Sequence, residues 1–134
     1  MTQTATIEKN HAIENARNWF EIIQAHILKI NAAVDAEDIN VHDTEMSELV
    51  EGPLSVMVRG GWHEVGKQAT DQEYEILLST GGPALRIVGE LNNYNQPQNA
   101  ELQWQDWGTP WTVYSLNSQE NRFLVEYANC FYFG

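Results

Sequence analysis

The sequence predicts an α+β fold in which helices cover one face of a four-stranded antiparallel meander sheet. Two patterns indicate this class. Apolar residues recur every three or four positions in the first third of the chain and near its C-terminus. In the middle of the chain they alternate with polar residues, and most of the glycine and proline lies there. With 134 residues, the chain is expected to form a single domain, 1–134.

The first helix is expected at residues 7–34. Its apolar stripe consists of Ala12, Ala16, Trp19, Phe20, Ile23, Ile27, Ile30 and Val34. Polar residues occupy the other positions, so one face is free to pack on the sheet. We expect Trp19 and Phe20 to anchor the helix there.

Two further helices are marked by their ends. A short helix, capped by Asp43 or Thr44, should end at Glu51, because glycine and proline follow it. The last helix should begin near Asn117, where Glu120 three residues later makes a variant of the capping box.

Four strands are expected, at residues 54–59, 74–79, 84–91 and 100–107. The connections between them are short, which favours antiparallel hairpins. The turn Gly81-Gly82-Pro83 resembles an anion-binding loop only in its glycines. A strand rather than a helix follows it, and the lysine of a phosphate loop is missing, so a hairpin turn is the better interpretation.

The charge limits the classes of partner. Asp and Glu number 19 and Lys and Arg 7, which gives a net charge of −12. This acidity opposes direct binding to nucleic acid or to an anionic membrane.

The polar N-terminus has no signal-peptide pattern, no apolar run is long enough to cross a bilayer, and Cys130 is the only cysteine. We therefore expect a cytosolic protein without a disulfide.

The acidic residues concentrate in one window. No basic residue lies between Lys29 and Arg59, and the acidic residues in this interval are Asp35, Glu37, Asp38, Asp43, Glu45, Glu48 and Glu51. Such a run commonly forms a solvated, solubilising face. It could also bind the basic groove of a nucleic-acid enzyme. The sequence leaves both interpretations open.

A tryptophan-rich segment is the alternative candidate for a binding site. Its residues are Trp104, Asp106, Trp107 and Trp111, and aromatic rings of this kind can stack on a base or a sugar. The competing interpretation is a strand end that fills the core, with Asp106 accepting turn hydrogen bonds from the backbone of Gly108 and Thr109. Alternation places Trp104 and Trp107 on opposite faces, which disfavours a shared stacking platform.

No motif predicts catalysis, a metal site or a cofactor. The histidines lack zinc-site spacing, and no nucleophile elbow surrounds Ser79, Thr80 or Cys130. A hydrolase or transferase would need His63, Glu64 or Asp106 to converge through the fold. We rank that hypothesis below binding.

Three segments, residues 73–83, 105–112 and 131–134, resemble a family of small acidic proteins encoded on bacteriophages, plasmids and integrated mobile elements. The resemblance covers about residues 54–134. It implies a bacterial cytosolic setting but no established activity, so it transfers no catalytic residue. Small acidic proteins of mobile elements are often similar to inhibitors of host defence, of the anti-CRISPR and anti-restriction types.

Two hypotheses of function follow. In the first, the chain is a non-enzymatic inhibitor whose acidic window binds a basic surface of a bacterial defence protein. In the second, it sequesters a small ligand or nucleotide. A homodimer would then build the pocket from Met57, Leu77 and Val88, which alternation places off the helix-covered face.

Overall fold

The computed structural model describes residues 2–67, 70–80 and 83–134, with side chains from residue 11 onward. The elements in order are α1 (Thr2–Asp35), α2 (Ile39–Glu51), β1 (Ser55–Gly60), β2 (Asp71–Ser79), β3 (Ala84–Glu90), β4 (Glu101–Gln105), β5 (Thr112–Val113) and α3 (Ser118–Ala128). The α+β class, the long N-terminal helix and the C-terminal helix are confirmed.

The sheet is an antiparallel meander in the order β1-β2-β3-β4-β5. The expectation of four strands was one short, because β5 has two residues and is too brief to show a period of two. β5 pairs with Gln103 and Trp104 of β4. Gly81 and Gly82 of the expected turn lie outside the described residues.

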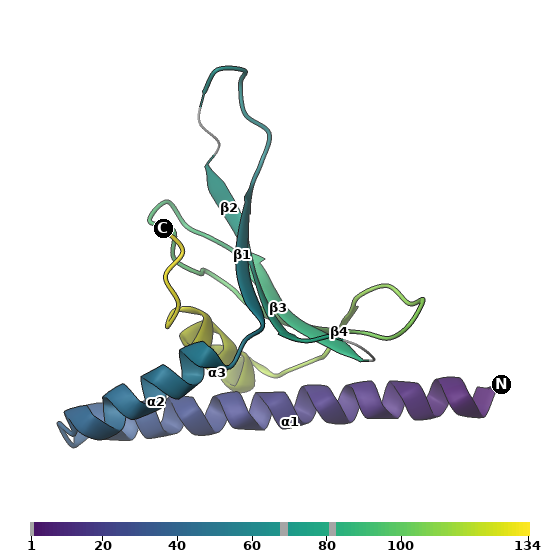
Figure 1. Ribbon diagram of the computed structural model, residues 1–134, viewed down its shortest axis with the longest axis horizontal. Helices are drawn as coiled ribbons and strands as arrows, with labels where there is room; N and C mark the ends of the chain where they lie inside the picture. Colours follow the sequence, from purple (N-terminus) through teal and green to yellow (C-terminus); the bar gives the residue numbers. More distant parts are fainter. Residues whose placement is uncertain (1, 68–69, 81–82) are drawn as a thin grey trace.

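The core lies between α1, α3 and one face of the sheet. α1 runs beneath the sheet, and α3 lies beside it near the same face (Figure 1). Phe20 is fully buried and meets Phe123 of α3 edge to face, with ring centroids 6.5 Å apart. Trp19 packs against this core but is only partly buried, so Phe20 is the stronger of the two expected anchors.

The start of α2 differs from the prediction. Asp38, and not Asp43 or Thr44, caps the helix, and its carboxylate accepts a hydrogen bond from the Val41 amide at 3.2 Å. The cause is the tight reversal after α1. Glu37 adopts a φ of 55°, which ends the first helix and directs the chain back along it. α2 therefore begins earlier and packs along α1.

The start of α3 is confirmed in detail. Asn117 and Glu120 form a reciprocal capping box. Arg17 of α1 donates a hydrogen bond to the Glu120 carboxylate at 2.8 Å. This contact joins the first turn of α3 to α1, and the Arg17 hydrogen bond holds the pKa of Glu120 below its ordinary value of 4.5.

Candidate partner-binding surface

The α1–α2 hairpin gathers most of the acidic window. Six carboxylates are exposed there, and we call them the acidic hairpin surface: Asp35, Glu37, Asp38, Asp43, Glu48 and Glu51. On α2, the side chains of Asp43, Glu48 and Glu51 project within an arc of about 140°, away from the buried Leu49. The fold thus presents them on one broad side of the helix.

Four of these carboxylates, those of Asp35, Glu37, Glu48 and Glu51, make no ion pair or hydrogen bond with any residue that the structure describes. Glu48 nevertheless lies within 4.8 Å of His26, so Asp35, Glu37 and Glu51 are the more open three. Asp38 is used as a helix cap, and Asp43 faces its neighbour His42 at 3.1 Å. The acidic hairpin surface therefore keeps charge that is available to a basic partner.

Most of the basic side chains that the structure describes form ion pairs with carboxylates of the same chain. Five of them do so, namely Arg17 with Glu120, Lys29 with Glu45, Arg59 with Glu73, Lys67 with Glu64 and Arg86 with Glu75. Among the basic residues whose side chains are described, Arg122 alone lacks such a pair. A phosphate backbone needs a cluster of available cations, and the described surface offers none.

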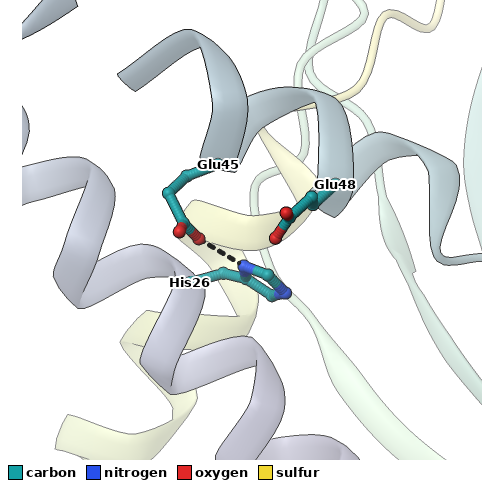
Figure 2. A group of neighbouring side chains, drawn as sticks. All are labelled: His26, Glu45 and Glu48. Atoms are coloured by element: carbon teal, nitrogen blue, oxygen red, sulfur yellow. Dashed lines mark hydrogen bonds and ion pairs between the residues drawn. The ribbon is translucent and has the colours of Figure 1, made fainter. Parts of the chain in front are cut away.

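Glu45 departs from the expected solvated position. Its side chain is only 12% exposed, because it turns toward α1 and accepts a hydrogen bond from Nδ1 of His26 at 2.8 Å (Figure 2). Lys29 lies 3.8 Å from its other oxygen. Glu45 therefore joins α2 to α1 and does not belong to a docking surface.

Glu48 points toward the same ring from the next turn of α2 (Figure 2). One atom each of His26, Glu45 and Glu48 lies within 4.8 Å of the others, which is a donor set that could hold a divalent cation. However, Glu45 is already engaged by His26 and Lys29 without a cation. Spacing along one helix could not reveal this cluster, because His26 and Glu45 are 19 positions apart on different helices.

The tryptophan-rich residues do not converge on one cavity. Trp104 is buried in the core, whereas Trp107 is 79% exposed. Asp106 is buried in the turn after β4, but its carboxylate accepts from the Trp107 amide and not from Gly108 or Thr109. Its carbonyl oxygen accepts from Thr109 instead, so the expected turn forms through the main chain.

Trp111 reaches the open face of the sheet. The guanidinium of Arg86 lies 4.1 Å from the centre of its ring, donates to Gln103 at 2.9 Å and pairs with Glu75 at 2.8 Å. Three strands and the residue before β5 build this cluster. No local sequence motif could have predicted it.

A shallow hollow of about 610 Å³ lies on this open face. Met57 and Val88 line it, and the strand register places Leu77 on the same face, which confirms the alternation. Its charged lining comprises four glutamates, Glu73, Glu75, Glu90 and Glu101, and two arginines, Arg59 and Arg86. The hollow therefore has a net negative lining.

The residues of the hydrolase hypothesis are separated. His63 and Glu64 lie in the exposed β1–β2 connection, where Glu64 pairs with Lys67 at 3.1 Å. Asp106 belongs to the β4–β5 connection at another end of the sheet (Figure 1). Cys130 is half-buried, and burial raises the pKa of its thiol. These groups share no site.

The chain was compared with protein-family models, curated proteins and solved structures, and none matches it. Among the described residues, no helix is long and apolar enough to cross a membrane.

Proposed function

We propose that this chain is a non-enzymatic binding protein that occupies a basic surface of a protein partner through the acidic hairpin surface. The resemblance to acidic proteins of mobile elements directs this proposal to bacterial defence proteins of the CRISPR or restriction type. Their nucleic-acid grooves hold Lys and Arg for phosphates, and a carboxylate surface can compete for the same side chains.

The observation that carries the proposal is the free charge of Asp35, Glu37 and Glu51. These carboxylates stand near the turn and at the far end of α2, and no described residue pairs with them. A purely solubilising face would serve equally well with its charges scattered or paired. Here the basic residues are paired elsewhere, which leaves this surface strongly negative.

The test is a triple reversal of Asp35, Glu37 and Glu51 to Lys. Its matched control reverses Glu14, Glu90 and Glu126, which are also exposed, so that the change in net charge is equal. Each protein is expressed in bacteria that carry a CRISPR or a restriction system, and the survival of incoming phage and plasmid is measured. The parent and the control should protect the incoming DNA, whereas the acidic triple should not.

Binding to the affected defence protein supplies the second readout. The parent's affinity should fall as salt rises, because exposed charges are screened over about 8 Å at physiological ionic strength. Equal protection by the parent and the acidic triple would refute the role of this surface. A parent that protects against neither system would refute the defence proposal itself.

A second candidate function uses the hollow on the open face. We propose a small ligand that is neutral or cationic, because four glutamates and two arginines line the hollow and disfavour a nucleotide. A ligand that binds near Arg86 should change the fluorescence of Trp111, because the Arg86 guanidinium lies 4.1 Å from the centre of the Trp111 ring. Titration of small-molecule panels should change tryptophan fluorescence in the parent and not in Trp111→Phe. No response across both cationic and neutral panels would contradict this function.

A further inference from the structure

β1 is exposed in a way that the other long strands are not. Tyr74, Ile76 and Leu78 of β2 are buried at alternate positions, whereas no residue of β1 is buried. Val56 and Val58 face the helix side of the sheet and are 38% and 39% exposed, and Met57 faces the other side and is 60% exposed. The β1–β2 hairpin projects away from the three helices (Figure 1), and both faces of β1 are partly open to solvent.

The outer edge of β1 is also open. β1 is the terminal strand of the sheet, and no described strand pairs with its outer side. Exposed edges are usually protected by lysine, proline or an inward-pointing charge. From Leu54 to Val58 there is no charge and no proline, and the bulge comes only at Arg59 and Gly60. The outward-facing backbone amide and carbonyl groups of β1 are therefore available to pair with another strand.

The charge around β1 indicates which molecule would pair with its outer edge. From Gly52 to Trp62 the single charged residue is Arg59, and Glu73 neutralises it. This segment is nearly neutral in a chain of net charge −12. It is thus a surface on which a second acidic copy meets little local repulsion, whereas the basic partner of the acidic hairpin surface would gain no charge contact there.

We propose that β1 pairs antiparallel with β1 of a second copy about a two-fold axis at Met57. This register places Met57 opposite Met57 and Val56 opposite Val58, so apolar side chains meet on both faces. The contact is isologous and closes on two copies, which gives one continuous ten-stranded sheet.

The two-fold axis has a consequence for the hollow. Met57 lines the hollow on the open face and lies on the axis. The two hollows therefore meet along the shared sheet. The inference is independent of the acidic hairpin surface, because no residue of α2 belongs to the paired strands.

The test is the mass of the protein in solution, measured by sedimentation velocity over a range of concentrations. The parent should form a dimer that strengthens as salt rises, since salt screens the repulsion between two acidic copies. Met57→Asp should raise the dissociation constant at least about tenfold, because it sets two like charges opposite each other. Val113→Asp is the control, since Val113 is exposed on the opposite edge strand, and it should leave the dimer intact.

The register is tested by mixing two variants. Met57→Asp and Met57→Lys should each be monomeric alone and should form a heterodimer when mixed, because opposite charges then face each other across the axis. Circular dichroism verifies that each variant is folded. A parent that stays monomeric at about 1 mM, which corresponds to a binding free energy weaker than about −4.1 kcal/mol, would overturn the inference. A dimer that Met57→Asp leaves unchanged, or variants that fail to pair when mixed, would also overturn it.

Discussion

Replacing Gly89 with Ala tests the close contact between Gly89 of β3, Tyr74 of β2 and the Asn99 carbonyl oxygen. Gly89 lies opposite Tyr74 in the β2–β3 pair. A Cβ at this position would overlap the Asn99 carbonyl oxygen and would stand 2.7 Å from the Tyr74 hydroxyl. That hydroxyl now donates to the Asn99 carbonyl at 2.6 Å, and the buried ring packs on Phe133 with centroids 5.1 Å apart.

The expected loss of stability is about 3 kcal/mol, within a range of about 1–6 kcal/mol that the following contributions set. Overpacking contributes about 1–3 kcal/mol. A buried Tyr74 hydroxyl without its acceptor costs about 1–3 kcal/mol more. The unfolded chain loses entropy on the change from glycine to alanine, which offsets about 0.4–1 kcal/mol. Since a domain of this kind is stable by about 5–15 kcal/mol, the variant should remain folded with a midpoint lower by roughly 10 °C.

Urea unfolding followed by tryptophan fluorescence and circular dichroism measures this change. Tyr74→Phe is the companion variant, and it should cost about 1 kcal/mol because it removes the hydrogen bond but keeps the ring. The double variant should cost less than the sum of the two, because the Tyr74–Asn99 hydrogen bond that Gly89→Ala disturbs is already absent in Tyr74→Phe. A Gly89→Ala protein as stable as the parent would refute this account of the contact between Gly89, Tyr74 and Asn99. So would losses of stability in the two single variants that add exactly in the double variant.

Three further predictions concern the helices. Phe20→Ala should destabilise the protein by about 3–5 kcal/mol in thermal unfolding. Trp19→Ala should destabilise it by about 1–3 kcal/mol, because the Trp19 side chain is only partly buried. Equal losses of stability in the two variants would contradict this packing. Glu120→Gln keeps the capping box but loses the charge pair, so the parent should be more stable above pH 4.5. That advantage should vanish as pH falls through the lowered pKa of Glu120, and a pH-independent difference would argue against the ion pair. Glu45→Lys should loosen α2 in hydrogen exchange, because it faces His26 and Lys29, while exposed Glu51→Lys should not; equal exchange would exclude the contact.

The fold followed from the sequence where a pattern was long. The stripe of α1 and the alternation of β2 each repeat often enough to define a buried face, and both were predicted. The last member of the stripe was wrong, because Val34 is exposed at the end of α1 and Ala33 is buried in its place. The cap of α2 was not, because Asp38, Asp43 and Thr44 are all suitable caps. The choice depended on the positive φ of Glu37, which decides where the chain turns back.

The candidate site was predictable in composition and not in geometry. The sequence shows that residues 35–51 are acidic, but it does not show that Glu45 turns inward to His26 while Glu51 stays in solvent. That difference depends on which side of α2 meets α1. Likewise, the cluster at Arg86 depends on the register of neighbouring strands, because Glu75 and Gln103 come from either side of β3.

The two proposed contacts respond to salt in opposite directions, and this follows from where the charge lies. In the proposed function, the acidic hairpin surface would attract a basic partner through exposed carboxylates, so salt should weaken that binding. The β1 edge has one charged residue, already neutralised, and the repulsion it must overcome comes from the remainder of a −12 chain. Screening should therefore strengthen self-association. Because charge is concentrated on the acidic hairpin surface and nearly absent from the β1 edge, the two proposed contacts would use different residues of the chain.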